Sequence, residues 1–430
     1  MKLFIGNRKV TEEEQTCFFS KIKQQIGGST LKKGDVLVCK AQTQYGIIAE
    51  WKVCQEMGLI PFFIAPDYNV EHSDFMKYSD AEYCLMIDGK EEIQFERIKK
   101  GTGAHLSIGS GSVIHMTSAT SGKPKFIVRS KEQLQLEVKR YCERLKLTKE
   151  DVILSIAPFF HAYAFLCPML GAIFADAALI QPDILMPRNV IELCKNQKVT
   201  CIFGIPYFFD KMAETDKAYM LYEKTRYVIS SGEKLTKETA KKFKDRFGIA
   251  LNQQYGSTET GTITFSDSTD PYECQGKPIP GVEFCIEKKD GKNHVLVNTH
   301  GTMGAYIKEQ ITPIADGFYA TNDLGYFDEE GRLFIEGRSD DIVVRAGEKI
   351  NIREVASVIE KMPGIEGVKI EVGTDTLKEM TCFYNADREY KTEEFLDYCK
   401  RYLSGFQIPR HFIKSSAEVG QKQNWKHNKK

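Results

Sequence analysis

Hydroxyl-bearing residues, a glycine and two lysines gather between residues 116 and 125, which read Met-Thr-Ser-Ala-Thr-Ser-Gly-Lys-Pro-Lys. An apolar run at Val113 and Ile114 precedes them, and another follows from Phe126 to Val128. A strand, a loop and a second strand of this kind can surround a polyphosphate with backbone N–H groups, hydroxyls and ammonium groups. The segment lacks the Gly-x-x-x-x-Gly-Lys-Ser/Thr spacing of the helix-opening nucleotide loop. It therefore predicts a different phosphate-binding loop, for which an ordinary polar turn is the alternative.

A second segment, Tyr255 to Thr260, places an aromatic ring, hydroxyls and a carboxylate around one glycine. Tyr255 can stack on a base, Thr258 can hydrogen-bond a phosphate oxygen, and Glu259 can hold Mg²⁺. Threonine beside glutamate is also common in turns and helix caps. By itself the segment fits both a nucleotide site and a plain turn.

The stretch from Gly317 to Asp341 holds two further candidates. Residues 328–331 are typical of a hairpin turn between apolar runs. Asp323 is an isolated acid that the hydroxyls of a ribose can use, and Arg338 stands where the composition of the chain changes. The alternative for these two residues is a surface ion pair, which usually contributes little to stability.

Layered α/β elements must position these segments. Short apolar runs at 36–39, 59–65 and 152–157 alternate with amphipathic patterns, which predicts strands covered by helices. Thr236 can cap a helix that ends before Gly248, where a left-handed residue is favoured. The larger part of the chain is therefore expected to be a large layered α/β domain.

A compact α+β block follows residue 337. The pattern predicts a helix over 352–361 that stops before Pro363, strands near 368–372 and 381–385, and a helix over 392–403. We expect a large domain over 1–337 and a small, mobile C-terminal domain over 338–430.

Composition excludes several classes of protein. The chain has 430 residues with 42% hydrophobic content, enough for two or three domains. Lys plus Arg and Asp plus Glu both count 59, so no net charge favours nucleic acid or an anionic membrane. The apolar stretch 156–180 contains His161, Asp176 and two prolines, and is interpreted as buried core and pocket wall rather than a membrane span.

The cysteines and the N-terminus favour the cytoplasm. The 12 cysteines form no Cys-x-x-Cys pair and no cluster at zinc-ligand spacing, so reduced thiols are expected. Residues 1–14 turn acidic and polar almost at once, unlike a secretory signal.

Six segments in a fixed order resemble the adenylate-forming superfamily of acyl-CoA synthetases, amino-acid adenylation domains and luciferases. The resemblance covers about residues 113 to 426. The segments are the phosphate loop 117–125, Tyr255 to Glu259, Thr321 to Asp323, Gly337 to Asp340, Arg345 to Ile350, and Asn424 to Lys426.

The resemblance implies a role for each matching residue. Tyr255 packs on adenine beside Gly232 and Glu233, Thr258 contacts the α-phosphate, and Glu259 binds Mg²⁺. The nucleotide is further held by the phosphate-loop residues and by the ribose and hinge motifs: Thr117, Ser118, Thr120, Ser121, Gly122, Lys125, Asp323 and Arg338.

The small domain takes part in both half-reactions in this family. The resemblance makes Asp340 the hinge and Lys426 the cation that bridges the carboxylate and the phosphate. Phe160, Gly256 and Gly347 are assigned to the acyl and thiol pocket, and His161 lies behind the carboxylate.

The chain departs from the family pattern at several positions. Ala119 and Ser121 replace a usual Gly and Thr, Asn322 replaces a Gly, and Trp425 replaces the Gly before the terminal Lys. Gly420 stands where Pro is common, and 116 residues precede Thr117, so a shortened N-terminal subdomain is expected. These departures make the assignment of Lys426 weaker than that of Asp323.

The acyl-site segment, residues 157–165, lacks the early Asp that amino-acid-activating members offer to a substrate ammonium. The segment is similar to that of the acyl-CoA and aryl-acid branches, in which His161 would lie in the pocket behind the carboxylate. The alternative is that His161 is a histidine of the hydrophobic core. The aromatic neighbourhood suits an aryl or medium acyl group without deciding chain length: Phe159, Phe160, Phe165, Phe203, Tyr207 and Phe208.

The resemblance implies activation of a carboxylic acid by Mg·ATP as its acyl-adenylate, followed by transfer to a thiol. The acceptor is coenzyme A or the phosphopantetheine of an acyl carrier protein, and the sequence does not separate them. A catalytically silent nucleotide-binding or regulatory homologue is the alternative, because the phosphate loop and residue 425 are altered.

Overall fold

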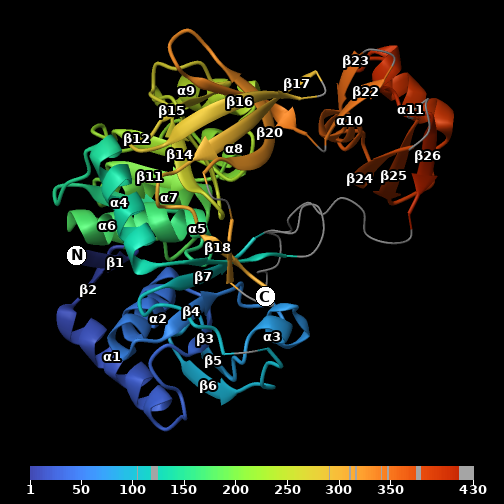
Figure 1. Cartoon of the computed structure of the whole chain (residues 1–430). Helices are drawn as coiled ribbons and strands as arrows, with labels where there is room; N and C mark the ends of the chain where they lie inside the picture. The colour runs from blue at the N-terminus through green and yellow to red at the C-terminus, as the bar shows by residue number, and fades with distance from the viewer. Residues whose placement is uncertain are drawn as a thin grey trace. The chain divides into compact units, whose positions relative to one another are not determined.

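The computed structural model describes residues 1–103, 105–117, 124–289, 291–308, 311–314, 317–339, 341–345, 348–373 and 379–415 (Figure 1). Contacts within the chain divide it into two compact units. The large unit contains 1–286, 296–320 and 326–335, and the small unit contains 287–295, 321–325 and 336–430. The division crosses strands, so a few segments contribute to both units.

The larger sheet has thirteen strands in the order β16-β17-β20-β21-β15-β14-β13-β12-β11-β9-β10-β1-β2. Six neighbouring strands run parallel: β13 (Asn252–Ser257), β12 (Tyr227–Ser230), β11 (Cys201–Gly204), β9 (Val152–Ser155), β10 (Ala178–Gln181) and β1 (Lys2–Ile5). Parallel neighbours need crossover connections, and these bring helices onto the faces of the sheet.

The remaining strands of this sheet flank the parallel group. At one edge β2 (Arg8–Val10) pairs antiparallel with β1. Toward the other edge lie β14 (Gly261–Phe265), β15 (Cys274–Pro278), β21 (Leu333–Arg338), β20 (Tyr319–Phe327), β17 (Lys292–Asn298) and β16 (Glu283–Lys289).

A second sheet of eight strands belongs to the large unit. Its parallel centre is β5 (Tyr83–Ile87), β3 (Val36–Ala41), β4 (Ile60–Phe63) and β7 (Val113–Met116). Antiparallel strands complete it: β6 (Ile93–Arg97), β8 (Phe126–Arg129), β18 (Ala305–Ile307) and β19 (Ile311–Pro313). Both faces are buried, because Leu37 and Cys39 enter one core while Val36 and Val38 enter another.

Helices cover these sheets in layers (Figure 1). One core joins both sheets through α1 (Glu12–Gly27), α2 (Gln44–Met57), α4 (Lys131–Leu145), α5 (Ala162–Ala164), a π-helix (Phe165–Leu170) and α6 (Gly171–Ala175). The other face of the larger sheet packs against α7 (Pro187–Asn196), α8 (Pro206–Ala213) and α9 (Lys237–Phe247). Outside the smaller sheet lie a 3-10 turn (Val70–His72) and α3 (Phe75–Tyr78). The expected layered α/β architecture is confirmed.

Local signals placed several elements correctly. The apolar runs at 36–39, 59–65 and 152–157 form β3, β4 and β9. Thr236 accepts a hydrogen bond from the Thr239 N–H at the start of α9, and Gly248 ends that helix with φ of 73°.

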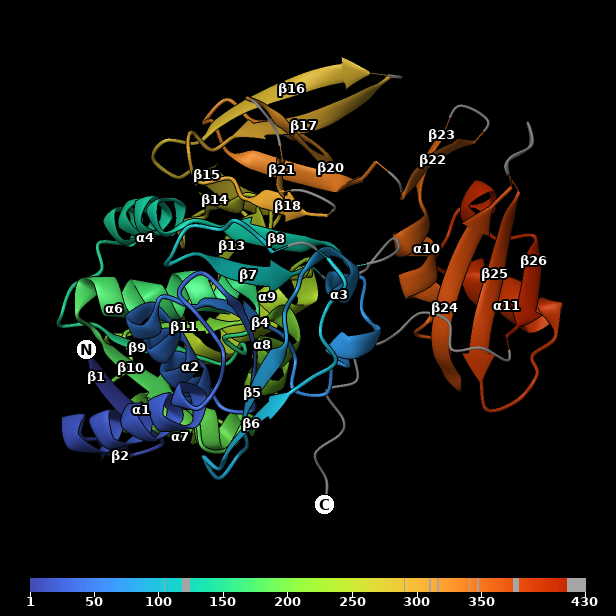
Figure 2. The ribbon, with the colours of Figure 1, turned by 60° about the horizontal axis from the view of Figure 1, so that its bottom comes forward.

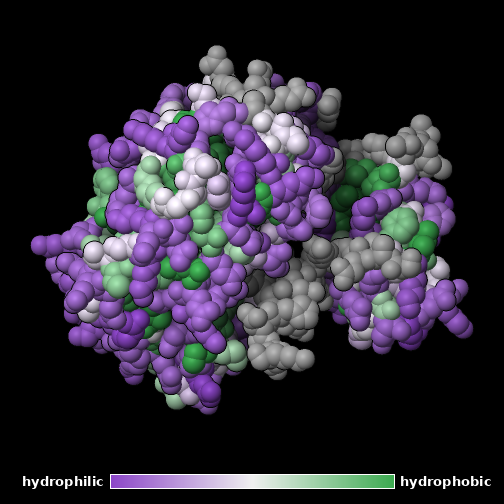
Figure 3. Space-filling view, turned by 90° about the horizontal axis from the view of Figure 1, so that it is seen from below, coloured by the Kyte–Doolittle hydropathy of each residue, from purple (hydrophilic) through white to green (hydrophobic). Residues whose placement is uncertain are grey.

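Most of the apolar stretch 156–180 is buried core, as expected, although His161, Phe174 and Asp176 are exposed. Every residue of the π-helix Phe165–Leu170 is buried, although Pro168 interrupts its hydrogen bonding. In the part of the chain that the structure describes, no helix has the length and apolar character needed to cross a membrane. The face drawn in Figure 3 is mostly hydrophilic, with hydrophobic residues scattered between.

The small unit has its own core. Its sheet has β24 (Ile365–Val372), β25 (Met380–Ala386) and β26 (His411–Lys414), with α10 (Ile352–Ile359) and α11 (Thr392–Cys399) beside it (Figure 2). A hairpin of β22 (Ile342–Arg345) and β23 (Glu348–Asn351) precedes α10, and a 3-10 turn (Gly405–Gln407) precedes β26. The predicted α+β block is therefore present, while the boundary at 337/338 stays a prediction.

Burial predicts which thiols react. Only Cys17 and Cys285 are exposed among twelve unpaired cysteines. Burial raises the pKa of four others to about 12: Cys84, Cys142, Cys167 and Cys201. In the native protein we expect N-ethylmaleimide to label two thiols quickly, and all twelve after unfolding. Mass spectrometry of the labelled peptides checks this, and rapid labelling of a third cysteine would contradict it.

Candidate nucleotide and acyl site

The candidate residues of the large unit follow the carboxyl ends of neighbouring parallel strands. Gly232 and Glu233 come after β12, Tyr255 lies at the end of β13, and Phe160 and His161 come after β9. The Ser231 hydroxyl donates a hydrogen bond of 2.8 Å to the carbonyl of Gln254, which ties two of these ends together. Ligands of α/β proteins bind at this edge of a parallel sheet. The topology thus gathers three segments far apart in sequence.

The segment from Tyr255 to Thr260 forms a hairpin between β13 and β14. Ser257 pairs with Gly261, and the register shifts by a bulge between Tyr255 and Gly256. A Cβ atom at Gly256 would overlap the carbonyl of Gly261, so the close approach of the two strands requires glycine. Ser257 and Thr260 close the turn, since each backbone N–H donates to the other's hydroxyl at 3.2 Å.

This turn presents Thr258 and Glu259 at its tip, and both are half-buried. The backbone carbonyl of Glu259 accepts a hydrogen bond of 3.0 Å from the Gly304 N–H. Within the described ranges, the Glu259 carboxylate has no ion-pair partner, and no group of three His, Cys, Asp or Glu side chains could hold a metal. A lone carboxylate fits Mg²⁺, which commonly takes one or two carboxylates plus phosphate and water oxygens.

Tyr255 and Glu233, the two candidates for contact with a base, differ in exposure. Tyr255 is half-buried and packs against the core that joins the two sheets. Glu233 is exposed, yet neighbouring protein desolvates its carboxyl group and raises its pKa above the ordinary value. Gly232 has φ of 86°, a conformation that favours glycine.

The ends of the predicted phosphate loop are held together. The Thr117 N–H donates to the carbonyl of Lys125 at 2.9 Å, and the Lys125 N–H donates to the Thr117 hydroxyl at 3.0 Å. The ammonium groups of Lys125 and Lys308 lie 5.2 and 5.5 Å from the ring of Tyr306 on β18. The strand–loop–strand prediction is confirmed for β7 and β8. The intervening Ser118, Thr120, Ser121 and Gly122 lie outside the described residues.

Two histidines in this region have opposite environments. His161 is exposed and its ring lies 4.4 Å from that of Phe160, so it is not a core histidine. Surrounding protein still desolvates the imidazole and lowers its pKa to about 4. His115 on β7 is buried against Phe63 and Phe165. Burial, with a smaller effect of the Arg129 charge, lowers the pKa of His115 to about 3.

The small unit carries Asp323 and Arg338, both half-buried, at β20 and at the end of β21. The Asp323 N–H donates to the Thr321 hydroxyl at 3.1 Å. Asn322 has φ of 63°, which explains why asparagine can replace the usual glycine at this position. The remaining candidates of this part of the chain, Asp340, Gly347 and Lys426, lie outside the described residues.

The sequence reasoning missed His115 and a buried ion pair, Arg129 with Glu137. A signal for the pair was present. Glu137 stands on the apolar face of helix α4, three residues after Leu134 and four before Tyr141, which are both buried. An acid at a core position of a helix usually has a charged partner.

Comparison with known proteins identifies the family. Residues 66–305 match the AMP-binding enzyme family, and the chain belongs to it. It is 28% identical over 325 residues to the medium-chain fatty-acid–CoA ligase of Escherichia coli, covering 70% of this chain and 57% of that protein. It is 22% identical to the 2-succinylbenzoate–CoA ligase of Bacillus subtilis, covering 96% of this chain and 90% of that protein.

The fold is that of the adenylate-forming enzymes. The structure of O-succinylbenzoate coenzyme A synthetase from Bacillus subtilis in complex with AMP superposes with a TM-score of 0.79 at 21% identity. That comparison covers 98% of this chain and 94% of the other. The resemblance inferred from the six segments is confirmed. The chain spans 57% to 63% of the length of three relatives that it matches.

The environment of His115 predicts a pH dependence of stability. A histidine that stays neutral when folded, with a pKa of about 3, is protonated in the unfolded chain below its ordinary 6.5. Stability is therefore complete above pH 6.5 and falls as the pH drops toward 3. For one such group, the free energy of unfolding falls by about 1.4 kcal/mol for each pH unit below 6.5. Because of His115, the protein should therefore be about 2 kcal/mol less stable at pH 5 than above pH 6.5.

We expect His115→Leu to lose less stability between pH 7 and pH 5 than the parent does. Urea unfolding at the two pH values measures this. His72→Leu, at an exposed position, is the control and should keep the parent's pH dependence. Equal losses in the parent and in His115→Leu would show that His115 does not titrate as inferred.

Proposed function

We propose that this protein is an AMP-forming acid–thiol ligase. A substrate carboxylate oxygen attacks the α-phosphorus of ATP, the bond to the bridging oxygen breaks, and pyrophosphate leaves. A thiolate then attacks the acyl carbon of the acyl-adenylate, forming the thioester as AMP leaves. The chain needs to supply no nucleophile of its own, in agreement with the burial of ten of its twelve cysteines.

The observation that carries this proposal is the hairpin turn that presents Thr258 and Glu259. The turn follows the carboxyl end of β13, whose parallel neighbour β12 leads into the segment that carries Glu233, in a chain of the AMP-binding enzyme family. Mg²⁺ held by Glu259 would offset the negative charge that develops on the phosphate oxygens. Thr258 and Lys125 would bind the phosphates, and Tyr255 would pack on the adenine.

The acid is proposed to be an aryl or medium acyl acid. Phe160 and His161 would line the acyl side, and residues 157–165 offer no carboxylate that would hold an ammonium group. The acceptor stays open between coenzyme A and a carrier protein. Relatives of both kinds exist, since a 3,4-dihydroxybenzoate–[aryl-carrier protein] ligase of Bacillus anthracis is 23% identical over 319 residues.

A catalytically silent nucleotide-binding homologue is the second candidate, favoured by Ala119 and Trp425 at positions where the family pattern has glycine. Exchange of labelled pyrophosphate into ATP, measured with a panel of aryl and acyl acids, separates the two. An enzyme shows exchange that depends on one class of acid. A silent homologue binds ATP and shows none with any acid.

Glu259→Gln should fold normally and lose most Mg-dependent pyrophosphate exchange, because a neutral amide replaces the charged oxygen ligand. Loss of a stabilising group of this kind typically costs about 10²- to 10³-fold in rate. Glu223→Gln, an exposed acid before the amino end of β12, is the matched control. Parental exchange in Glu259→Gln would remove this residue from the site.

The two half-reactions are expected to use different residues of the C-terminal domain. Lys426→Ala should abolish adenylate formation yet convert a supplied acyl-adenylate to thioester, because its cation serves the first step only. Gly347→Leu should do the reverse, because a side chain there would block the pantetheine arm. Both steps are measured separately for both variants. Normal adenylation by Lys426→Ala, or equal loss of both steps in both variants, would contradict a domain rotation about Asp340.

A further inference from the structure

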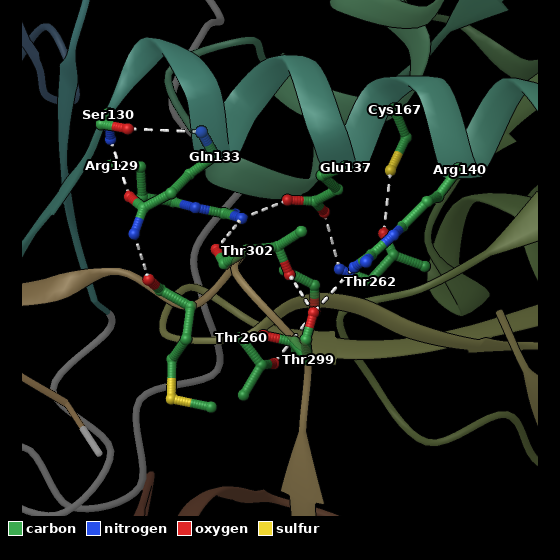
Figure 4. Close-up of polar contacts among 12 residues, drawn as sticks. Arg129, Ser130, Gln133, Glu137, Arg140, Cys167, Thr260, Thr262, Thr299 and Thr302 are labelled. Carbon is green, nitrogen blue, oxygen red and sulfur yellow. Dashed lines mark hydrogen bonds and ion pairs between the residues drawn. The ribbon is translucent and has the colours of Figure 1, made fainter. Parts of the chain in front are cut away.

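A buried ion pair lies between the two sheets of the large unit. Arg129, the last residue of β8, has a fully buried side chain, and its guanidinium contacts the carboxylate of Glu137 on α4, whose side chain is 2% exposed (Figure 4). Two of the guanidinium nitrogens of Arg129, Nε and Nη1, are buried without a partner among the described residues. Burying an arginine with so few hydrogen-bond partners lowers the free energy of unfolding.

Glu137 connects this pair to the hairpin that carries Glu259. Its other carboxylate oxygen accepts a hydrogen bond of 2.8 Å from the backbone N–H of Thr262 on β14. Gly261, with φ of 71°, lies so close that a Cβ atom there would overlap the Glu137 carboxylate. Glu137 therefore holds β14 at Thr262, two residues after the turn ends at Thr260.

Arg129 connects the same pair to the segment between β17 and β18. Its guanidinium donates to the carbonyl of Thr302 at 2.5 Å. Two more side chains of α4 hold this segment, since Gln133 donates to the carbonyl of Met303 at 2.5 Å and Arg140 donates to that of Thr299 at 2.7 Å (Figure 4).

The segment held by Arg129 reaches the turn from its other side. The N–H of Gly304, two residues after Thr302, donates to the carbonyl of Glu259. The turn is thus fixed at Glu259 through Arg129 and at Thr262 through Glu137. Both routes meet in one ion pair, which does not include the Glu259 carboxylate.

We propose that Arg129 and Glu137 are positioning residues that set the place of the Glu259 carboxylate for Mg·ATP. This inference rests on the proposed function. A buried ion pair adds little to stability compared with apolar side chains of similar volume. This pair holds the N–H of Thr262 and the carbonyl of Thr302. Outer partners of this kind hold a metal ligand in place without touching the metal.

Two variants separate positioning from stability. Glu137→Gln keeps the volume but leaves the Arg129 charge unpaired. The double variant Arg129→Met with Glu137→Leu removes both charges and fills the space, so its thermal stability should stay near that of the parent. In both we expect the Mg²⁺ concentration for half-maximal binding of an ATP analogue to rise by about 10-fold, the lower end of the cost of losing a direct partner of a metal ligand, because this pair holds the turn through its backbone.

Asp151→Asn is the matched control. Asp151 is 5% exposed and pairs with Arg226 before the amino ends of β9 and β12, at the opposite edge of the sheet. This variant should lose thermal stability and keep the parental Mg²⁺ requirement for binding. It shows how a pair behaves when its buried carboxylate serves stability alone, since the Arg226 side chain of this pair is exposed.

Hydrogen exchange of the unliganded proteins gives a readout that does not depend on ATP. The amide of Thr262 and those of residues 302–304 should exchange faster in both pair variants, and at the parental rate in Asp151→Asn. Parental exchange and parental Mg²⁺ dependence in the double variant would overturn the proposal. If the parent binds no ATP analogue, the proposed function is overturned instead. In that case, faster exchange at Thr262 in the pair variants than in the parent would still support the positioning of the turn.

Discussion

Parallel pairing in the larger sheet is the constraint on which the rest of this structure depends. Two parallel neighbours cannot be joined by a short turn, so each connection must cross a face of the sheet and return to the same edge. The segments after β9, β12 and β13 therefore lie at one edge, although about a hundred residues separate Phe160 from Tyr255. The candidate site is a consequence of this connectivity before any side chain is considered.

The hairpin turn with Thr258 and Glu259 lies where the parallel group of strands ends. At β13 the sheet changes from parallel to antiparallel pairing, and the chain can reverse tightly through the hairpin to β14. Gly256 permits the close approach of the two strands, Gly261 permits that of the Glu137 carboxylate, and the turn carries Thr258 and Glu259. A tight turn on a rigid sheet holds a metal ligand more precisely than a long loop does.

A buried ion pair links the two sheets of the large unit. Arg129 comes from the eight-stranded sheet, Glu137 from the helix between the sheets, and Thr262 from the thirteen-stranded sheet. The same interior keeps His115 neutral, since burial and the nearby guanidinium both disfavour a second cation. Burial of charge is costly, and here Arg129 and Glu137 each hold a backbone group near the candidate site.

The order of the motifs, the layered α/β class and most strands and helices were determined by the sequence itself. These features depend on local information: apolar period, capping residues such as Thr236, and glycines where φ is positive, as at Gly248. The identity of Tyr255, Glu259 and Asp323 as candidates also came from short segments, which carry their chemistry in a few adjacent residues.

Only the tertiary structure decided which polar residues are buried and which backbone groups they hold. Glu137 meets Thr262 across 125 residues of chain, and Arg129 meets Thr302 across 173. No local pattern encodes such pairings, because they depend on how two sheets and a helix pack together. The contrast between exposed His161 and buried His115 has the same origin, since a side chain's environment is set by neighbours that are distant in sequence.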